Sequence, residues 1–184
     1  AFSRAHPNIT VHLSERTDPF ALAGSGFDAA VHFEHLAWAG MRTYPLLQEV
    51  LVPVCHPALI KGAKASVPLN QLPRLHRRQS PDAWQRYAKD SGIPLTNPAV
   101  GARYDLHAML IEAALAGLGV ALVPRLYVEA ELVQGQLVAP WPQGEAVSKT
   151  FCLVLSEPIG LTAGPVQAFA HWLQDEARAA RMEN

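Results

Sequence analysis

The stretch of residues 99–139 limits the possible folds of this chain more than any other. It reads AVGARYDLHAMLIEAALAGLGVALVPRLYVEAELVQGQLVA. Apolar residues recur at helical spacing from Leu106 to Gly117, and the short apolar run Val120–Val123 is typical of a buried strand. We therefore predict a strand near Val100, a polar turn at residues 103–105, a helix and a second strand.

The connections within this stretch indicate how its strands pair. Asp105 is a suitable N-cap for the helix, and Gly117 and Gly119 would end it. Because most other positions of this helix are apolar, we expect it to be covered on more than one side. Pro124 suits the first turn of a further helix, predicted over residues 125–133. Strand, helix and strand joined by tight connections form a parallel crossover, which predicts an α/β protein.

Composition excludes several classes of protein. The chain has 184 residues, 49% of them hydrophobic and 17% charged, so it can fold around a sizeable core. No apolar run reaches the roughly 20 residues that span a bilayer, and we expect neither a signal peptide nor membrane association. With 15 basic and 16 acidic residues the chain lacks the basic excess of a DNA-binding surface. Two cysteines, Cys55 and Cys152, fit a reducing cytoplasm.

The rest of the chain alternates predicted strands and helices. We predict strands at 9–13, 27–33, 41–47, 49–55, around Leu75 and at 150–155, and helices at 1–5, from Asp18–Pro19 to about Gly24, at 81–90 and at 164–181. This order implies two αβ lobes joined by crossing strands near 52–55 and 151–155. The outer lobe would be 1–53 plus 153–184 and the inner lobe 54–152, with a ligand cleft between them.

Several segments, in the correct order, resemble the effector-binding domain of LysR-type transcriptional regulators. EAALAGLGVALVPRLYVEAELVQGQLV, following GARYD, is similar to the capped helix, glycine pair and proline-ended strand of that domain's C-terminal half. HPNITVHLSE and GFDAAVHF resemble its second and third strands, EVLVPVCHPAL its crossing strand, and LPRLHRR the strand that follows. The resemblance covers essentially the whole chain and implies a two-lobe, type 2 periplasmic-binding-protein-like fold.

The resemblance also implies a function. The domain would bind a small-molecule effector between its lobes and control transcription through a winged helix-turn-helix outside this chain, without a cofactor, a metal or catalysis. It implies side-by-side homodimers, and tetramers in the full-length protein. In that family a strand and a full helix precede the HP found here at 6–7, so we expect the chain to be a piece that lacks the first strand. The alternative is a periplasmic-type solute-binding protein, and an enzyme on the same scaffold is a third reading.

Candidate ligand-binding residues follow from the carboxyl ends of the predicted strands, where open α/β sheets bind ligands. They are Ser14, Glu15, Arg16, Thr17, His32 and Phe33 in the outer lobe, and Arg78, Gln79, Ser80, Arg103, Tyr104, Asp105 and Val123 in the inner lobe. Arg78 or Arg103 would bind a carboxylate bidentately, and helix N-termini at Ser80 and Asp105 would favour an anion. The expected effector is therefore a small carboxylate or amino acid. The alternative is that the hydroxyls and Asp105 only cap helices and the arginines are solvated.

Three other groups of residues have a structural and a functional interpretation. His32 and His35 are spaced H-x-x-H, but with no third ligand nearby we favour ordinary surface histidines over a zinc site. Cys55 and Cys152 lie on the two crossing strands, where buried small apolar side chains are favoured over a redox switch. The basic run 74–78 could bind phosphate or nucleic acid, but a solvated face or a carboxylate site is the commoner outcome.

Overall fold

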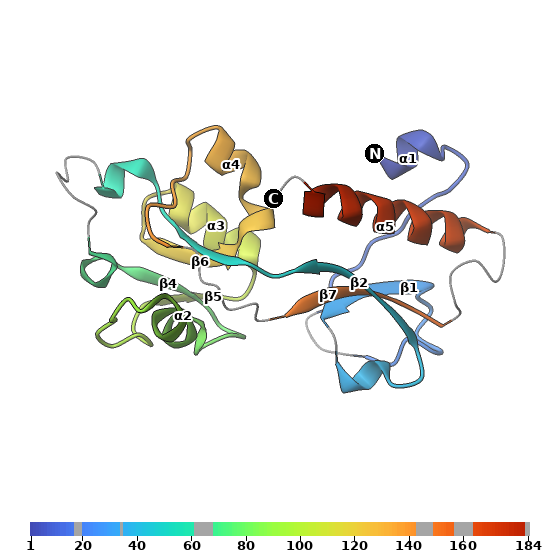
Figure 1. The fold of residues 1–184 in the computed structure, drawn as a ribbon, viewed down its shortest axis with the longest axis horizontal. Coiled ribbons are helices and arrows are strands. Elements are labelled where there is room, and N and C mark those ends of the chain that lie inside the picture. Colours follow the sequence, from blue (N-terminus) through green and yellow to red (C-terminus); the bar gives the residue numbers. More distant parts are fainter. Residues whose placement is uncertain (17–19, 34, 61–67, 143–148, 157–163, 183–184) are drawn as a thin grey trace. The chain divides into compact units, whose positions relative to one another are not determined.

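The computed structural model of the chain describes residues 1–16, 20–33, 35–60, 68–142, 149–156 and 164–182. These residues form two compact units, each with its own β-sheet (Figure 1). The first unit comprises residues 1–48 and 149–184, and the second comprises residues 49–148. The predicted α/β class is confirmed, because each sheet is covered by helices. None of the helices described is long and apolar enough to cross a membrane.

The first unit is built on a three-stranded antiparallel sheet. Its strands are β1 (Ala29–Phe33), β2 (Arg42–Gln48) and β7 (Thr150–Leu155), in the order β1-β7-β2. Its helices are α1 (Phe2–Ala5) and α5 (Pro165–Met182), with a 3-10 turn, η1, at Leu36–Trp38. All three strands lie close to their predicted positions, and β7 coincides with its prediction.

The central strand β7 packs on both of its faces. Leu153 and Leu155 pack in one cluster with Ala170 and Ala177 of α5. Val154, which points to the opposite face as the pleat requires, packs against residues that include Leu22 and Trp38. Since β7 is hydrogen-bonded on both edges and buried on both faces, it holds the first unit together.

Residues 9–13 do not form the predicted strand. Val11 is 36% exposed and Leu13 is 86% exposed, so their alternating side chains do not face a core. A strand is stabilised by backbone hydrogen bonds to a neighbour, and in the described ranges β1 pairs with β7 alone. The helix predicted to start at Asp18–Pro19 begins outside the described residues, and residues 22–26 form a bend and a turn.

The second unit contains a four-stranded sheet in the order β3-β6-β4-β5. Its strands are β3 (Leu51–Val54), β4 (Arg74–Arg77), β5 (Ala102–Tyr104) and β6 (Val120–Pro124). Strands β4, β5 and β6 are parallel, and β3 is antiparallel to β6. The helix α3 (His107–Leu115) connects β5 to β6, which confirms the predicted parallel crossover.

The remaining helices of the second unit are short. They are α2 (Ala83–Ser91), α4 (Glu129–Val133) and the 3-10 turns η2 (Pro57–Ile60), η3 (Leu69–Gln71) and η4 (Arg125–Tyr127). The predicted helix 81–90 corresponds to α2, which ends at Gly92, a residue with a positive φ of 70°. The single helix predicted over 125–133 is instead divided into η4 and α4, because the fully buried Val128 adopts a non-helical φ of −129° and ψ of 15°.

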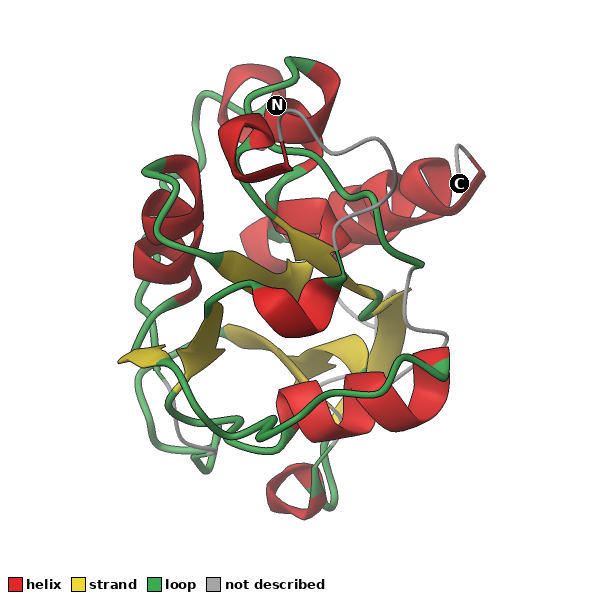
Figure 2. Cartoon of the chain, turned by 90° about the vertical axis from the view of Figure 1, so that its left-hand side faces the viewer, coloured by secondary structure: helices red, strands yellow, loops and turns green. Residues whose placement is uncertain are grey.

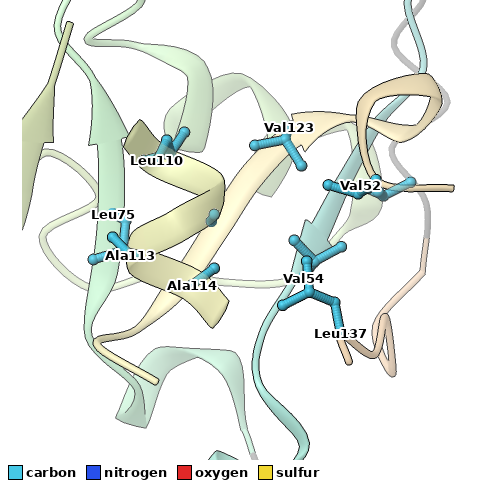
Figure 3. Packing of buried hydrophobic residues seen from close by; sticks show 10 residues of the cluster. Val52, Val54, Leu75, Leu110, Ala113, Ala114, Val123 and Leu137 are labelled. Atoms are coloured by element: carbon cyan, nitrogen blue, oxygen red, sulfur yellow. The ribbon is translucent and has the colours of Figure 1, made fainter. Parts of the chain in front are cut away.

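The sheet of the second unit separates two apolar clusters. On one face Val52, Val54 and Val123 pack with Leu110 of α3 (Figure 3). On the other face Val120 and Leu122 pack with side chains of α2, among them Trp84, whose Nε1 donates to the carbonyl of Leu75 at 3.0 Å. The sheet is thus covered on both faces, as parallel strands require (Figure 2).

The expectation that α3 is covered on more than one side is wrong for this chain. Ala108 and Glu112 are exposed, and Met109 is 50% exposed. Only the face that carries Leu110, Ala113 and Ala114 is buried against the sheet. An apolar sequence therefore overstates the coverage of this helix.

The edge strand β5 is held close to β4 by a glycine and two hydrogen-bonded side chains. A Cβ atom on Gly101, whose φ is +152°, would lie 2.0 Å from the carbonyl oxygen of Arg74. The Arg74 Nη2 donates to the carbonyls of Thr96 at 2.8 Å and Asn97 at 3.0 Å. The His76 Nε2 donates to the carbonyl of Val100 at 3.0 Å. These contacts fix the loop before β5 and so set where residues 103–105 lie.

Candidate functional site

The carboxyl ends of β4 and β5 bring two predicted segments together in the second unit. The parallel register pairs Arg77 with Tyr104, and the backbone N–H of Arg78 donates to the carbonyl of Tyr104 at 2.8 Å. The loops at 77–80 and 103–105 are therefore neighbours, next to the N-terminus of α3. This is the strand end at which α/β sheets bind ligands.

Asp105 forms an ion pair instead of the predicted helix cap. The N-cap of α3 is Leu106, in extended conformation and without a side-chain cap, so Asp105 lies one residue too early. Its Oδ1 accepts a hydrogen bond from Arg78 Nε at 2.7 Å, and the two side chains are 63% and 61% exposed. Such an exposed pair stabilises a fold by about 0–1 kcal/mol, so its main effect is to balance the charge of Arg78.

Arg77 lies in a different environment from its neighbour. Its guanidinium donates to the Oε1 of Gln79 from two atoms, Nε at 3.0 Å and Nη2. Its Nη1 donates to the Nδ1 of His107 and lies 3.2 Å from the Nε2 of the same ring. Arg77 is half-buried. The pair links the end of β4 to the first residue of α3.

His107 is neutral at ordinary pH in this setting. Burial, followed by the adjacent Arg77 charge, lowers its pKa from 6.5 to about 4. The neutral ring keeps one nitrogen that can accept a hydrogen bond from Arg77. The Tyr127 ring lies edge-on to His107, with centroids 5.2 Å apart.

The other second-unit candidates occupy varied positions. Ser80 is half-buried in a turn, where its N–H donates to the carbonyl of Arg77 at 3.1 Å. It is not at a helix N-terminus as expected, because α2 begins at Ala83. Arg103 and Tyr104 belong to β5 and not to a turn; Arg103 is exposed, with Nη2 donating to the carbonyl of Ala99 at 3.1 Å. Val123 is fully buried in the core, so its side chain offers no surface to a ligand.

In the first unit, Ser14, Glu15 and Arg16 are exposed on an irregular segment, and Thr17 lies outside the described residues. The Arg16 guanidinium lies over aromatic rings, at 5.3 Å from Phe20 and 5.1 Å from Phe27.

His32 and Phe33 end β1. The Phe33 ring lies 4.4 Å from the ring of Phe151, between centroids, and 4.5 Å from Lys149 Nζ. The His32 Nδ1 donates to the carbonyl of Phe33 at 3.1 Å, and its ring contacts Trp38 edge-on.

Sequence reasoning missed His107, and it assigned the binding of a carboxylate to Arg78 or Arg103 although Arg77 lies in the selected strand-end segment 77–80. The available signal for His107 was its polarity, since it is one of two polar side chains in an otherwise apolar helix. Arg77 was indistinguishable from Arg78 in a basic run.

Two other functional interpretations find no support in the described residues. The basic run 74–78 is not a surface patch, because Arg74 is 7% exposed and His76 is 2% exposed. Within the described ranges, no group of three or more His, Cys, Asp or Glu side chains could hold a metal ion.

The cysteine side chains are both buried. Burial raises the pKa of the Cys55 thiol from 9.0 to about 11, so it is protonated and unreactive at ordinary pH. The Sγ of Cys152 lies 3.7 Å from the carbonyl oxygen of Thr150.

Comparisons with known proteins give a consistent result. The family model described as the LysR substrate binding domain matches residues 1–178. The HTH-type transcriptional regulator TrpI of Pseudomonas aeruginosa is 32% identical over 179 residues, which cover 95% of this chain and 60% of TrpI. The glycine cleavage system transcriptional activator of Escherichia coli is 29% identical over 182 residues, covering 97% of this chain and 59% of the activator. The chain therefore spans about 60% of the length of these curated relatives.

Solved structures of regulators resemble this chain as well. The effector domain of the transcriptional regulator AmpR of Pseudomonas aeruginosa has a TM-score of 0.78 and 26% identity, covering 100% of this chain and 89% of that one. The regulatory domain of CrgA from Neisseria meningitidis has a TM-score of 0.72 at 16% identity, covering 96% of this chain and 88% of that one, which is a likeness of fold.

Proposed function

Because the chain belongs to the LysR substrate-binding domain family, we propose that it senses a small molecule on behalf of a larger transcriptional regulator. It is the effector-binding domain of a LysR-type regulator, with the two-lobe, periplasmic-binding-protein-like α/β fold of its structural neighbours. The match over residues 1–178 is the observation that carries this conclusion. The alternative, a solute-binding protein, is not favoured, since the matching proteins are named as transcriptional regulators.

The lobes and the effector site are part of the proposal. We propose an outer lobe of residues 1–53 plus 153–184 and an inner lobe of residues 54–152. The boundaries between the two compact units, at 48/49 and 148/149, lie within five residues of these limits and support the division. The inner lobe binds the polar group of the effector at the carboxyl ends of β4 and β5. The support is the convergence there of two loops rich in hydrogen-bonding side chains with the uncapped N-terminus of α3, whose backbone N–H groups attract negative charge. The first-unit residues remain candidates.

We propose a small carboxylate or amino acid as the effector. Arginine side chains bind carboxylates bidentately, and two of them, Arg77 and Arg78, lie at this strand end. The effector would act by binding one arrangement of the protein more tightly than another, which is the only way a ligand can shift such an equilibrium.

The partners of the whole regulator are also proposals. DNA would be bound by a winged helix-turn-helix outside this chain, the domains would form homodimers, and the full-length protein would form tetramers acting in the cytoplasm. The match to regulators with HTH-type names supports this assignment.

A thermal-shift screen tests the proposed function. The chain is melted with amino acids, aromatic acids and carboxylates of central metabolism. One chemical class should raise the melting temperature, since a ligand at a hundredfold excess over its dissociation constant stabilises the native state by about 2.7 kcal/mol.

Variants locate the binding site. The double variant Arg77→Gln with Arg78→Gln should lose the shift, and Lys89→Gln, an exposed change on α2, should keep it. A chain that melts cooperatively and responds to no compound would contradict the proposal, and a shift that survives in the double variant would move the site elsewhere.

A further inference from the structure

The charge of Arg77 distinguishes it from the two other arginines near this strand end. Arg78 is paired with Asp105. Arg103 is exposed and donates to the carbonyl of Ala99. Arg77 is half-buried and donates only to neutral groups, Gln79 and His107. The ion pairs of the described residues include none with Arg77.

A partly buried cation without a counter-ion is unfavourable, and it favours any anion that can reach it. Gln79 and His107 hold the guanidinium as neutral acceptors, so neither contact balances its positive charge. A carboxylate that replaced one of them would turn a contact with a neutral acceptor into a bidentate ion pair. Arg78 could do the same only by giving up its contact with Asp105.

We propose that Arg77 binds the anionic group of the effector, and that His107 positions the guanidinium in the free domain and takes up a proton when the anion binds. The inference rests on the proposed function and identifies which side chain selects the effector. It also specifies an anion over a neutral compound.

The proton uptake follows from the groups around His107. From β4 it faces the Arg77 cation, and from η4 it faces the ring of Tyr127. Asp105, just before α3, is paired with Arg78, and Glu112 on α3 is exposed. Burial, followed by the Arg77 charge, lowers the pKa of His107 from 6.5 to about 4. A bound anion would offset the second of these causes, so this pKa would rise. The affinity for the anion should therefore increase as the pH falls toward the pKa of His107.

The probes for the test are benzoate, acetate and benzamide. Benzamide has nearly the shape of benzoate but no charge. The 184-residue chain, labelled with ¹⁵N, is titrated with each probe at about pH 7 and about pH 5.5, while the Arg77 Nε–H and the His107 ring nitrogens are followed by NMR.

We expect benzoate or acetate to shift the Arg77 and His107 signals saturably, with benzamide inactive. Affinity should rise several-fold at the lower pH. Arg77→Gln should reduce the affinity by about tenfold or more, and Arg78→Gln should reduce it less. Lys89→Gln, an exposed change on α2, is the control and should stay within about twofold of the parent. His107→Gln should bind the anion at neutral pH but lose the pH dependence. A dispersed ¹⁵N–¹H spectrum verifies that each variant folds.

Several results would overturn the inference. They are no change at Arg77 with either anion, equal effects of benzoate and benzamide, a greater loss in Arg78→Gln than in Arg77→Gln, or an unchanged pH dependence in His107→Gln. The two proposals fail separately. A neutral compound that stabilises the chain while both anions leave Arg77 unchanged supports the sensor and refutes the anion site. Binding of an anion at Arg77, with no metabolite that stabilises the chain, supports the anion site and refutes the sensor.

Discussion

Replacing Gly101 by alanine should destabilise the second unit far more than its size suggests. The new Cβ would lie 2.0 Å from the carbonyl oxygen of Arg74 and 2.7 Å from Cδ2 of His76, so β5 would have to move away from β4. The φ of +152° adds strain of about 1–3 kcal/mol. Loss of the hydrogen bonds from His76 to Val100 and from Arg74 to Asn97 adds about 1 kcal/mol for each of the two. The expected loss in free energy of unfolding is about 3–5 kcal/mol.

A second glycine provides the matched control. Gly117 also has a positive φ, +74°, but a Cβ there meets nothing within 4 Å. Gly117→Ala should therefore lower the free energy of unfolding by only about 1–2 kcal/mol, which is the penalty for alanine in the left-handed conformation. Urea denaturation followed by tryptophan fluorescence and circular dichroism measures both. Equal losses in the two variants would refute the close approach of β4 and β5 as the cause. Gly101→Ala should also weaken anion binding, because β5 carries the loop that neighbours Arg77.

Two further predictions concern α3. Leu110→Ala, which empties a fully buried position, should lower the free energy of unfolding by about 3–5 kcal/mol in the same assay. Met109→Ala, at a side chain 50% exposed, should lower it by less than about 1 kcal/mol. Similar losses in the two variants would contradict the one-sided burial of the helix. The second concerns His107, whose folded pKa of about 4 lies below the ordinary 6.5. The unfolded chain therefore binds the proton more readily, and stability should fall as the pH drops from 6.5 toward 4. Denaturation across this range should show a smaller fall for His107→Gln, and identical profiles would contradict the assignment.

The elements that sequence predicts well depend on local signals. The helix α2 ends at Gly92 because the chain there needs a positive φ, which glycine adopts without strain. The buried strands β3, β6 and β7 are continuous apolar runs, and they lie where those runs are. The order of these segments was enough to predict the LysR-type family and the fold class, and the comparisons confirm both predictions.

The failures depend on partners that are distant in the sequence. Residues 9–13 have the alternation of a strand, but alternation cannot supply a neighbouring strand. Asp105 has the identity of a helix cap, but Arg78 on the adjacent loop binds its carboxylate. Arg77 and Arg78 look alike in the sequence. The neighbours that β5 and α3 bring to the end of β4 distinguish them, because Arg78 contacts the carboxylate of Asp105 and Arg77 contacts the neutral Gln79 and His107.

The position of β7 in the first unit has a consequence for synthesis of the protein on the ribosome. The second unit is one unbroken segment, residues 49–148, so it can complete its core while translation continues. Strands β1 and β2 emerge earlier, yet each pairs with β7, which comes from residues 150–155. Until β7 emerges, the nascent chain carries two strands without their shared partner, next to a unit that can already fold. Residues 1–48 are thus translated before the second unit but reach their native structure after it, and in this interval their unpaired strand edges most need a chaperone.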